Sequence, residues 1–197
     1  VGNEYLGNPQ DNSVWRDTHV EIHGPATLSF QLSFTEDWHW ATQYLPSIEW
    51  LGCPAQGDSN VMCIASGPAD ETESATLYFT HLIHSAKKRC WLVSPYFVPD
   101  QNLVSALQLA GLRGIDIRIL VPEKSDSWLV QQAMRGYIQS LSRCNVRFFT
   151  YKKGFLHHVF CFMRFFNNTP SHVVHGSMVL LVKRELCFGV SMKTVFN

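Results

Sequence analysis

The sequence lacks long apolar runs. None of its 197 residues falls in a stretch of about 18 consecutive apolar residues, the length that a helix needs to cross a bilayer. The opening segment VGNEYLGNPQ is neither basic nor apolar enough for a signal peptide. We therefore expect a chain without a membrane anchor, either cytoplasmic or peripheral to a membrane.

An excess of charge of either sign is also missing. Sixteen Lys and Arg residues balance 16 Asp and Glu residues, so the formal net charge is zero. Domains that bind nucleic acid usually carry a clear positive excess. The balance argues against a nucleic-acid partner, and any chemistry on phosphate must be local. With 46% hydrophobic residues, the chain is rich enough to build a globular core.

Metal-binding spacings are absent as well. Zinc sites and redox pairs commonly use C-x2-C pairs, and the sequence has none. A cluster of His157, His158, His172 and His175 matches no closed zinc template. We expect no metal site, and we expect reduced cysteines in the core. The six cysteines are Cys53, Cys63, Cys90, Cys144, Cys161 and Cys187.

Strands and helices alternate in the middle of the chain. Asp100 is a suitable N-cap for one helix, and Ser125 or Asp126 for a later one. This alternation predicts right-handed crossovers and a largely parallel sheet. The expected helices are 70–88, one from 101 that ends at Gly111 or Gly114, and one that follows Ser125 or Asp126. The expected strands are 90–93, 115–122 and 146–151.

The N-terminal part has a less regular pattern. The alternation around Val20 and Ile22 predicts a short strand, and the residues after it, 26–40, have helical spacing. A further short strand is expected at 61–64.

Ligands of open parallel sheets lie beyond the carboxyl ends of the strands. Three segments are expected to meet there: 94–100, 122–126 and 154–158. This edge of the sheet is therefore the place to look for a site.

Several separate stretches resemble one family. SPYFVPD at 94–100, SALQLAGLRGIDIRILVPEKSD after it and VRFFTYKKGFLH at 146–157 resemble the second half of bacterial cardiolipin synthases, members of the phospholipase D superfamily. NEYLG, WRDTHVEIHGPA and FTEDWHWAT, further upstream, resemble the segment between the two catalytic motifs of that family. Together the stretches cover about the first 158 residues in the family's order.

The resemblance implies a fold and a division of the chain. The fold is α/β, a phospholipase D-like mixed, largely parallel sheet flanked by helices, and mainly the second of the family's two domains. Residues 1–50 would belong to the end of the first half, 51–157 to the second domain, and 158–197 to a divergent C-terminal tail.

The resemblance also implies a reaction. Cardiolipin synthases join two phosphatidylglycerol molecules into cardiolipin and release glycerol, at the bacterial inner membrane and without a cofactor. Two H-x-K-x4-D motifs act together in that family, and one histidine forms a phosphohistidine while the other protonates the leaving alkoxide. Anionic phospholipid and the membrane surface are the implied partners.

The sequence departs from this pattern at the catalytic motifs. The second motif would begin at His157, but Val159 stands in place of its Lys and Arg164 in place of its Asp. The first motif, expected upstream of NEYLG, is not in the chain. We expect a truncated pseudoenzyme in which His157 is the one catalytic candidate. Our hypothesis for both departures is an open reading frame broken by mutation.

Three residues are candidates for substrate binding. The resemblance places Ser94 and Tyr96 where the family lines its phosphate pocket, and Lys124 at the rim. The alternatives are that Tyr96 and Phe97 cap the core and that Lys124 is a solvated charge.

Two other functions stay open. One is a non-catalytic module that binds anionic phospholipid or a partner protein. The other is a phospholipase D-type phosphodiesterase, which would still need both histidines. Tryptophans at 15, 38, 40 and 50 suit packing against further protein, so self-association is expected. Residues 158–197 are apolar enough to add an edge strand.

Overall fold

A computed structural model describes residues 15–16, 21–55, 57, 60–66, 71–125, 127–152, 154–156, 160–164, 171–175 and 178–182. The helices are α1 (Thr27–Thr42), α2 (Ser74–Ser85), α3 (Gln101–Leu112) and α4 (Trp128–Ser142). The strands are β1 (Trp15–Arg16), β2 (Asn60–Cys63), β3 (Arg89–Val93), β4 (Asp116–Pro122), β5 (Val146–Tyr151), β6 (Phe155–Leu156), β7 (Phe160–Arg164), β8 (Ser171–His175) and β9 (Met178–Val182).

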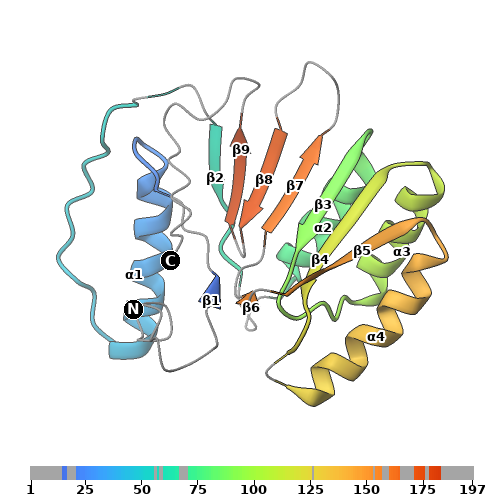
Figure 1. Cartoon of the computed structure of the whole chain (residues 1–197). Coiled ribbons are helices and arrows are strands. Elements are labelled where there is room, and N and C mark those ends of the chain that lie inside the picture. Colours follow the sequence, from blue (N-terminus) through green and yellow to red (C-terminus); the bar gives the residue numbers. More distant parts are fainter. Residues whose placement is uncertain are drawn as a thin grey trace.

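Within this part of the chain, seven strands form one mixed sheet in the order β2-β9-β8-β7-β3-β4-β5 (Figure 1). Parallel pairing joins β3 to β4 and β4 to β5, and the other neighbours are antiparallel. The predicted α/β fold with a mixed sheet is confirmed, and its parallel part is confined to these three strands. A separate parallel pair joins β1 to β6.

Helices α3 and α4 form the crossovers between the parallel strands. The Asp100 carboxylate caps α3, since it accepts hydrogen bonds from the backbone N–H groups of Asn102 and Leu103 at 2.7 and 3.0 Å. The predicted N-cap of α4, Ser125 or Asp126, was wrong, because the N-cap position lies one residue beyond Asp126. Ser127 occupies it and accepts from the Val130 N–H at 3.5 Å.

Ser125, one of the two predicted caps, instead accepts a hydrogen bond from the Ser127 N–H at 3.3 Å and so lies in the turn before α4. The other predicted cap, Asp126, lies outside the described residues.

The core lies between the helices and one face of the parallel strands. Ile117, Ile119 and Val121 alternate along β4 and are almost fully buried, as are Cys90 on β3 and Val146 on β5. Side chains of successive strand residues point to opposite faces, so this alternation turns one face of the sheet toward the helices. In Figure 1 helices α2, α3 and α4 gather at that part of the sheet.

Residues beyond 159 contribute strands inside the sheet. β7 pairs with β3, and β8 and β9 continue the sheet toward β2. The expected edge strand in this tail was wrong, because the edges of the described sheet are β2 and β5. The reason is that antiparallel hairpins let β7, β8 and β9 fill the space beside β3.

The short strand expected near Val20 does not include the described residues that follow Val20. Residues 21–23 have no regular structure, and Val20 lies outside the described residues. The segment from 21 to 26 instead leads into α1 through a turn in which the Thr27 N–H donates to the Gly24 carbonyl oxygen at 3.1 Å.

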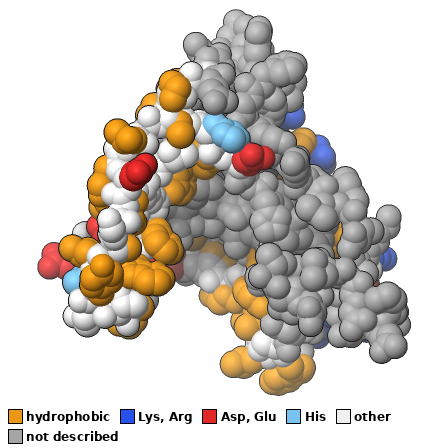
Figure 2. Space-filling view, turned by 90° about the vertical axis from the view of Figure 1, so that its left-hand side faces the viewer, with side chains coloured by type: hydrophobic (Ala, Val, Ile, Leu, Met, Phe, Trp, Pro, Cys, Tyr) orange, Lys and Arg blue, Asp and Glu red, His pale blue; other side chains and the backbone are white. Residues whose placement is uncertain are grey.

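Helix α1 contributes little to the core. Among its residues only Thr35 is buried, whereas Leu32, Phe34, Trp38 and Trp40 are exposed. Figure 2 shows hydrophobic side chains gathered on the side of the molecule where α1 lies. An exposed apolar surface of this kind usually marks an interaction site. None of the described helices is long and apolar enough to span a bilayer.

Candidate functional site

The carboxyl ends of β3 and β4 are held together by the backbone. The Ser94 N–H, one residue past β3, donates to the carbonyl oxygen of Leu120 on β4 at 3.1 Å. In the loop that follows, the Val98 N–H donates to the Tyr96 carbonyl oxygen at 3.0 Å. The SPYFVPD segment therefore turns back tightly over the strand ends before Asp100 starts α3.

A pocket of about 200 Å³ opens beside this loop. Ser94 and Tyr96 are the polar residues of its wall, and the rest of the wall is apolar. Tyr96 is 41% exposed, so its side chain faces solvent in part. The apolar wall consists of Phe79, Ile83, Leu92, Val93, Phe97, Val98, Pro99, Leu103 and Leu107, from α2, β3, the loop and α3.

The size and lining of the pocket limit what it can hold. Pockets for small organic ligands usually measure roughly 300–1,000 Å³. This one is smaller and has two polar side chains, so it suits a short apolar piece of a ligand whose polar part lies outside. It does not have the set of charged donors that would hold a phosphate by itself.

Tyr96 and Phe97 are neighbours in the loop but have different surroundings. Phe97 belongs to the core, since it is 7% exposed. Its ring packs edge to face against the ring of Phe148 on β5, with 5.6 Å between the ring centroids. Tyr96, its neighbour, lines the pocket. Phe97 therefore caps the core, whereas a ligand-binding role of Tyr96 stays a prediction.

Lys124 lies at the end of β4 but not in the wall of this pocket. Its side chain is exposed. The backbone around it is fixed, because the Glu123 N–H donates to the Tyr151 carbonyl oxygen at 3.0 Å and the Gln131 side chain donates to the Glu123 carbonyl oxygen at 3.0 Å. Ser94 and Tyr96 thus share one pocket, and Lys124 stands apart from it.

His157 lies outside the described residues, as do His158 and Val159. The strand that leads to His157 is described: β6 ends at Leu156, which is 1% exposed, and β6 lies against β4 and pairs with β1. In Figure 1, β6 lies near the ends of β4 and β5. The chain therefore reaches residue 156 at the edge of the sheet where the site was expected.

The described part of the chain holds no group of three or more His, Cys, Asp or Glu side chains that would bind a metal ion. The side chains of His157, His158, His172 and His175 are not among those that the structure describes.

Comparison with known proteins shows the family of the chain. Residues 79–180, more than half of the chain, match the family described as "Cardiolipin synthase, PLD-like domain". The match continues past Val159.

Curated relatives are similar over most of the chain. Cardiolipin synthase A of Pseudomonas putida is 47% identical over 159 residues, which cover 80% of this chain and 33% of that protein. Cardiolipin synthase A of Pseudomonas aeruginosa strain LESB58 is 47% identical over 160 residues, 80% of this chain and 32% of that protein. The chain thus spans about a third of the length of these relatives.

Among solved structures, Nuc from Salmonella typhimurium, a phospholipase D family member, is similar with a TM-score of 0.47 and 15% identity. The similarity covers 64% of this chain and 84% of that chain.

Proposed function

The chain belongs to the cardiolipin synthase family with a phospholipase D-like domain. From this premise we propose that it corresponds to part of an enzyme that joins two phosphatidylglycerol molecules into cardiolipin and glycerol. The family reaction would pass through a phosphohistidine. A histidine suits this role because imidazole near neutral pH is both a nucleophile and an acid, and because two displacement steps are easier than one.

The chain itself would not complete this reaction. Val159 and Arg164 replace the Lys and Asp of the second motif. Without the Lys, the charge that builds up on the phosphoryl oxygens lacks a stabilising cation. Catalytic residues that act as a unit also fail as a unit, so His157 alone would give little turnover.

The single observation that carries the proposal of a lipid ligand is the pocket beneath Ser94 and Tyr96. Its wall is almost entirely apolar, and it opens beside the carboxyl end of β3. An apolar pocket next to a polar rim fits an amphipathic molecule, with the apolar part inside and the charged headgroup outside. Ser94 and Tyr96 would then meet the headgroup of an anionic phospholipid, and Lys124, which is exposed after β4 and outside the pocket, would attract the negative charge of the lipid surface.

This ligand would keep the chain at the surface of the bacterial inner membrane as a peripheral protein. The exposed aromatic side chains of α1 also support self-association. The phosphodiesterase alternative has no observation in its favour, because it needs the same two catalytic motifs.

Turnover is tested by incubating the purified chain with phosphatidylglycerol vesicles and measuring cardiolipin and glycerol together. We expect neither product to exceed the level given by a His157→Ala control, with folding of both chains checked by circular dichroism. Turnover that disappears in the control would contradict the proposed inactivity.

Binding is tested separately by flotation with vesicles of phosphatidylglycerol or phosphatidylcholine. We expect flotation with the anionic vesicles, reduced about threefold or more by Lys124→Ala and by Leu103→Trp, which fills the pocket. Lys87→Ala is the matched control, because Lys87 is another exposed positive charge and lies before the start of β3, whereas Lys124 follows the end of β4. Equal losses in Lys87→Ala and Lys124→Ala would show nonspecific attraction to the membrane and contradict the site.

A further inference from the structure

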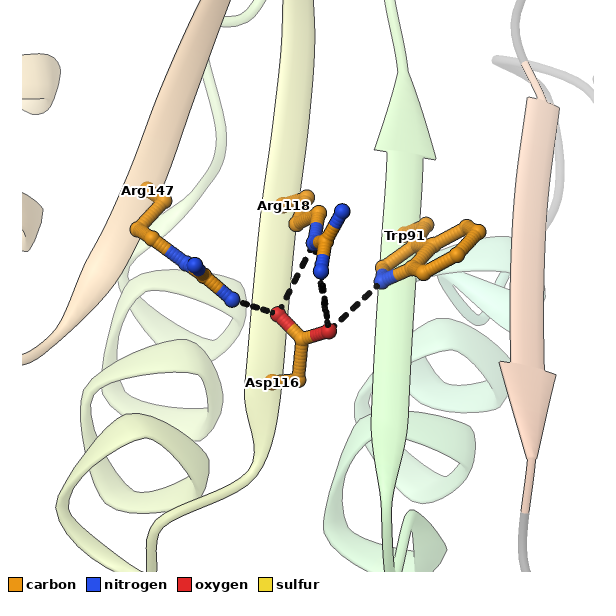
Figure 3. A network of polar contacts seen from close by, with 4 residues as sticks. All are labelled: Trp91, Asp116, Arg118 and Arg147. Carbon is orange, nitrogen blue, oxygen red and sulfur yellow. Dashed lines mark hydrogen bonds and ion pairs between the residues drawn. The ribbon is translucent and has the colours of Figure 1, made fainter.

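The face of β3, β4 and β5 that is turned away from the helices carries a polar network. Figure 3 shows Trp91, Asp116, Arg118 and Arg147 on this face, with the helices behind the strands. Arg118 forms a two-pronged ion pair with the Asp116 carboxylate, with Nε 3.0 Å from Oδ1 and Nη2 3.0 Å from Oδ2. Arg147 donates to Oδ1, and the Trp91 indole N–H donates to Oδ2 at 3.3 Å. Both carboxylate oxygens of Asp116 are therefore occupied.

The network holds more positive than negative charge. The Trp91 ring lies under two guanidinium groups, those of Arg89 at 5.0 Å and Arg118 at 4.8 Å from its centroid. Such stacking orients a guanidinium without neutralising it. Three arginines face one carboxylate in the described structure, and the side chains of Arg118 and Arg147 are 42% and 55% exposed. We call these five residues the Arg–Trp face.

A parallel sheet is normally covered on both faces. Helices α2, α3 and α4 cover one face of β3, β4 and β5, while the exposed arginines show that the other face is open in the described structure. A segment that covers this face would bury three guanidinium groups that share one carboxylate, so a segment that brings further carboxylates suits it.

The chain contains a segment with the complementary charge. Residues 17–86 include nine Asp and Glu residues and no Lys or Arg, whereas residues 87–164 include twelve Lys and Arg residues and four Asp and Glu residues. The zero net charge thus conceals an acidic segment followed by a basic one. Opposite charge on two surfaces of one chain favours contact between copies.

Helix α1 is the element of the acidic segment that suits the Arg–Trp face. Leu32, Glu36 and Trp40 are spaced four residues apart, so they lie along one side of the helix, and Asp37 is next to them. All four side chains are exposed. The side of α1 that lacks a partner therefore carries two carboxylates between a Leu and a Trp.

The length of α1 matches the size of the Arg–Trp face. A helix of 16 residues is about 24 Å long. Three strands are about 14 Å wide, and a strand of seven residues is about 23 Å long. One helix would cover most of the face.

We propose that α1 of one copy docks on the Arg–Trp face of a second copy, with Glu36 and Asp37 opposite the three arginines. The chain's own α1 is excluded because it contacts β2, and three strands separate β2 from β3 in the sheet. Trp40, which is 83% exposed, would be buried by the contact, and Trp and Arg are residue types that often dominate interface energies.

The test measures self-association of the full chain by sedimentation velocity over a range of concentrations. We expect a dimer that is weakened at least tenfold by Glu36→Lys with Asp37→Lys, and also weakened by 1 M salt because screening acts on exposed charges. Glu71→Lys with Glu73→Lys is the matched control, since it reverses two exposed charges of the same acidic segment outside α1 and should leave the dimer unchanged.

A second pair of variants tests the face directly. Arg89→Glu with Arg147→Glu reverses the face and keeps the Arg118–Asp116 pair that supports it. We expect this variant to be monomeric alone and to form a heterodimer when mixed with the Glu36→Lys, Asp37→Lys chain, because both contacts become complementary again.

Three results would overturn the proposal. They are a monomer at every concentration, association that survives both charge reversals, and no heterodimer from the mixed variants although each is folded by circular dichroism. Loss of anionic-vesicle binding in the face variant, with wild-type chain monomeric, would assign the face to phospholipid instead.

Discussion

The two faces of the parallel strands β3, β4 and β5 are built from the same short stretches of sequence and have opposite surroundings. On one face Ile117, Ile119 and Cys90 are fully buried beneath the helices. On the other face Asp116 and Arg118, their direct neighbours in sequence, form an ion pair that solvent reaches. Alternation along each strand separates the two environments completely.

One face of each strand is therefore stabilised by packing against the helices, whereas the other face is open to solvent in the described structure. The buried face depends on dispersion and on removal of apolar area from water. The open face depends on hydrogen bonds and charge, which solvent weakens. Substitutions on the two faces should therefore differ in size by severalfold.

Ile117→Ala should destabilise the protein more than any other substitution considered for these strands. This side chain is 0% exposed in the centre of the core, and its truncation should lower the free energy of unfolding by about 4 kcal/mol. Arg118→Ala, one residue away on the open face, should cost about 1 kcal/mol or less. Urea unfolding followed by circular dichroism measures both. Equal losses would mean that the two faces are equally important for folding.

A second pair of variants tests how closely the helices approach the covered face. A Cβ atom added at Gly111 of α3 would lie 2.0 Å from the carbonyl oxygen of Cys144, so backbone must move, and Gly111→Ala should cost about 2 to 3 kcal/mol. Gly136 of α4 meets no described atom within 4 Å of such a Cβ. Gly136→Ala should therefore stabilise the protein by up to about 1 kcal/mol through helix propensity.

Thermal unfolding of the two glycine variants beside the wild type gives the comparison. The expected shifts have opposite signs. A stabilising Gly111→Ala would show that α3 has room to move away from the turn at Cys144, and that the helix layer is looser than its contacts indicate.

Elements with strong local signals could be predicted from the sequence. Asp100 sits before a run of helix formers, and its carboxylate does cap α3, because a cap depends on atoms two and three residues away. The alternation of Ile117 and Ile119 likewise predicted β4. Strands β7, β8 and β9 were not predicted as interior strands, since their pairing depends on partners far away in sequence.

The candidate site was predicted in part. Ser94 and Tyr96 line the same pocket, because both follow the end of β3. Lys124 follows β4 and does not line that pocket. The role of His157 stays a prediction. The network at Asp116 was missed, since polar residues that alternate with apolar ones along a strand are usually solvated. The signal that would have indicated it is the charge segregation before and after residue 87.

The smallest expected effect concerns the open face. Partial burial raises the pKa of the Asp116 carboxyl, but hydrogen bonds from Arg118, Arg147 and Trp91 and the charge of Arg118 outweigh it and hold the pKa below its usual value. A carboxyl with a lowered pKa in the folded state stabilises that state above its unfolded pKa, near 3.8, and this contribution is lost as the pH falls through the folded pKa.

We therefore expect the free energy of unfolding to fall below about pH 4, by less than about 1 kcal/mol from this group because its pair is exposed. Asp116→Asn should remove that part of the pH dependence, whereas Asp100→Asn should keep it, because Asn still caps a helix. Urea midpoints between pH 3 and pH 7 measure the difference. An Asp116→Asn profile that matches the wild type would mean that the ion pairs of Asp116 contribute nothing measurable to the free energy of unfolding in this pH range.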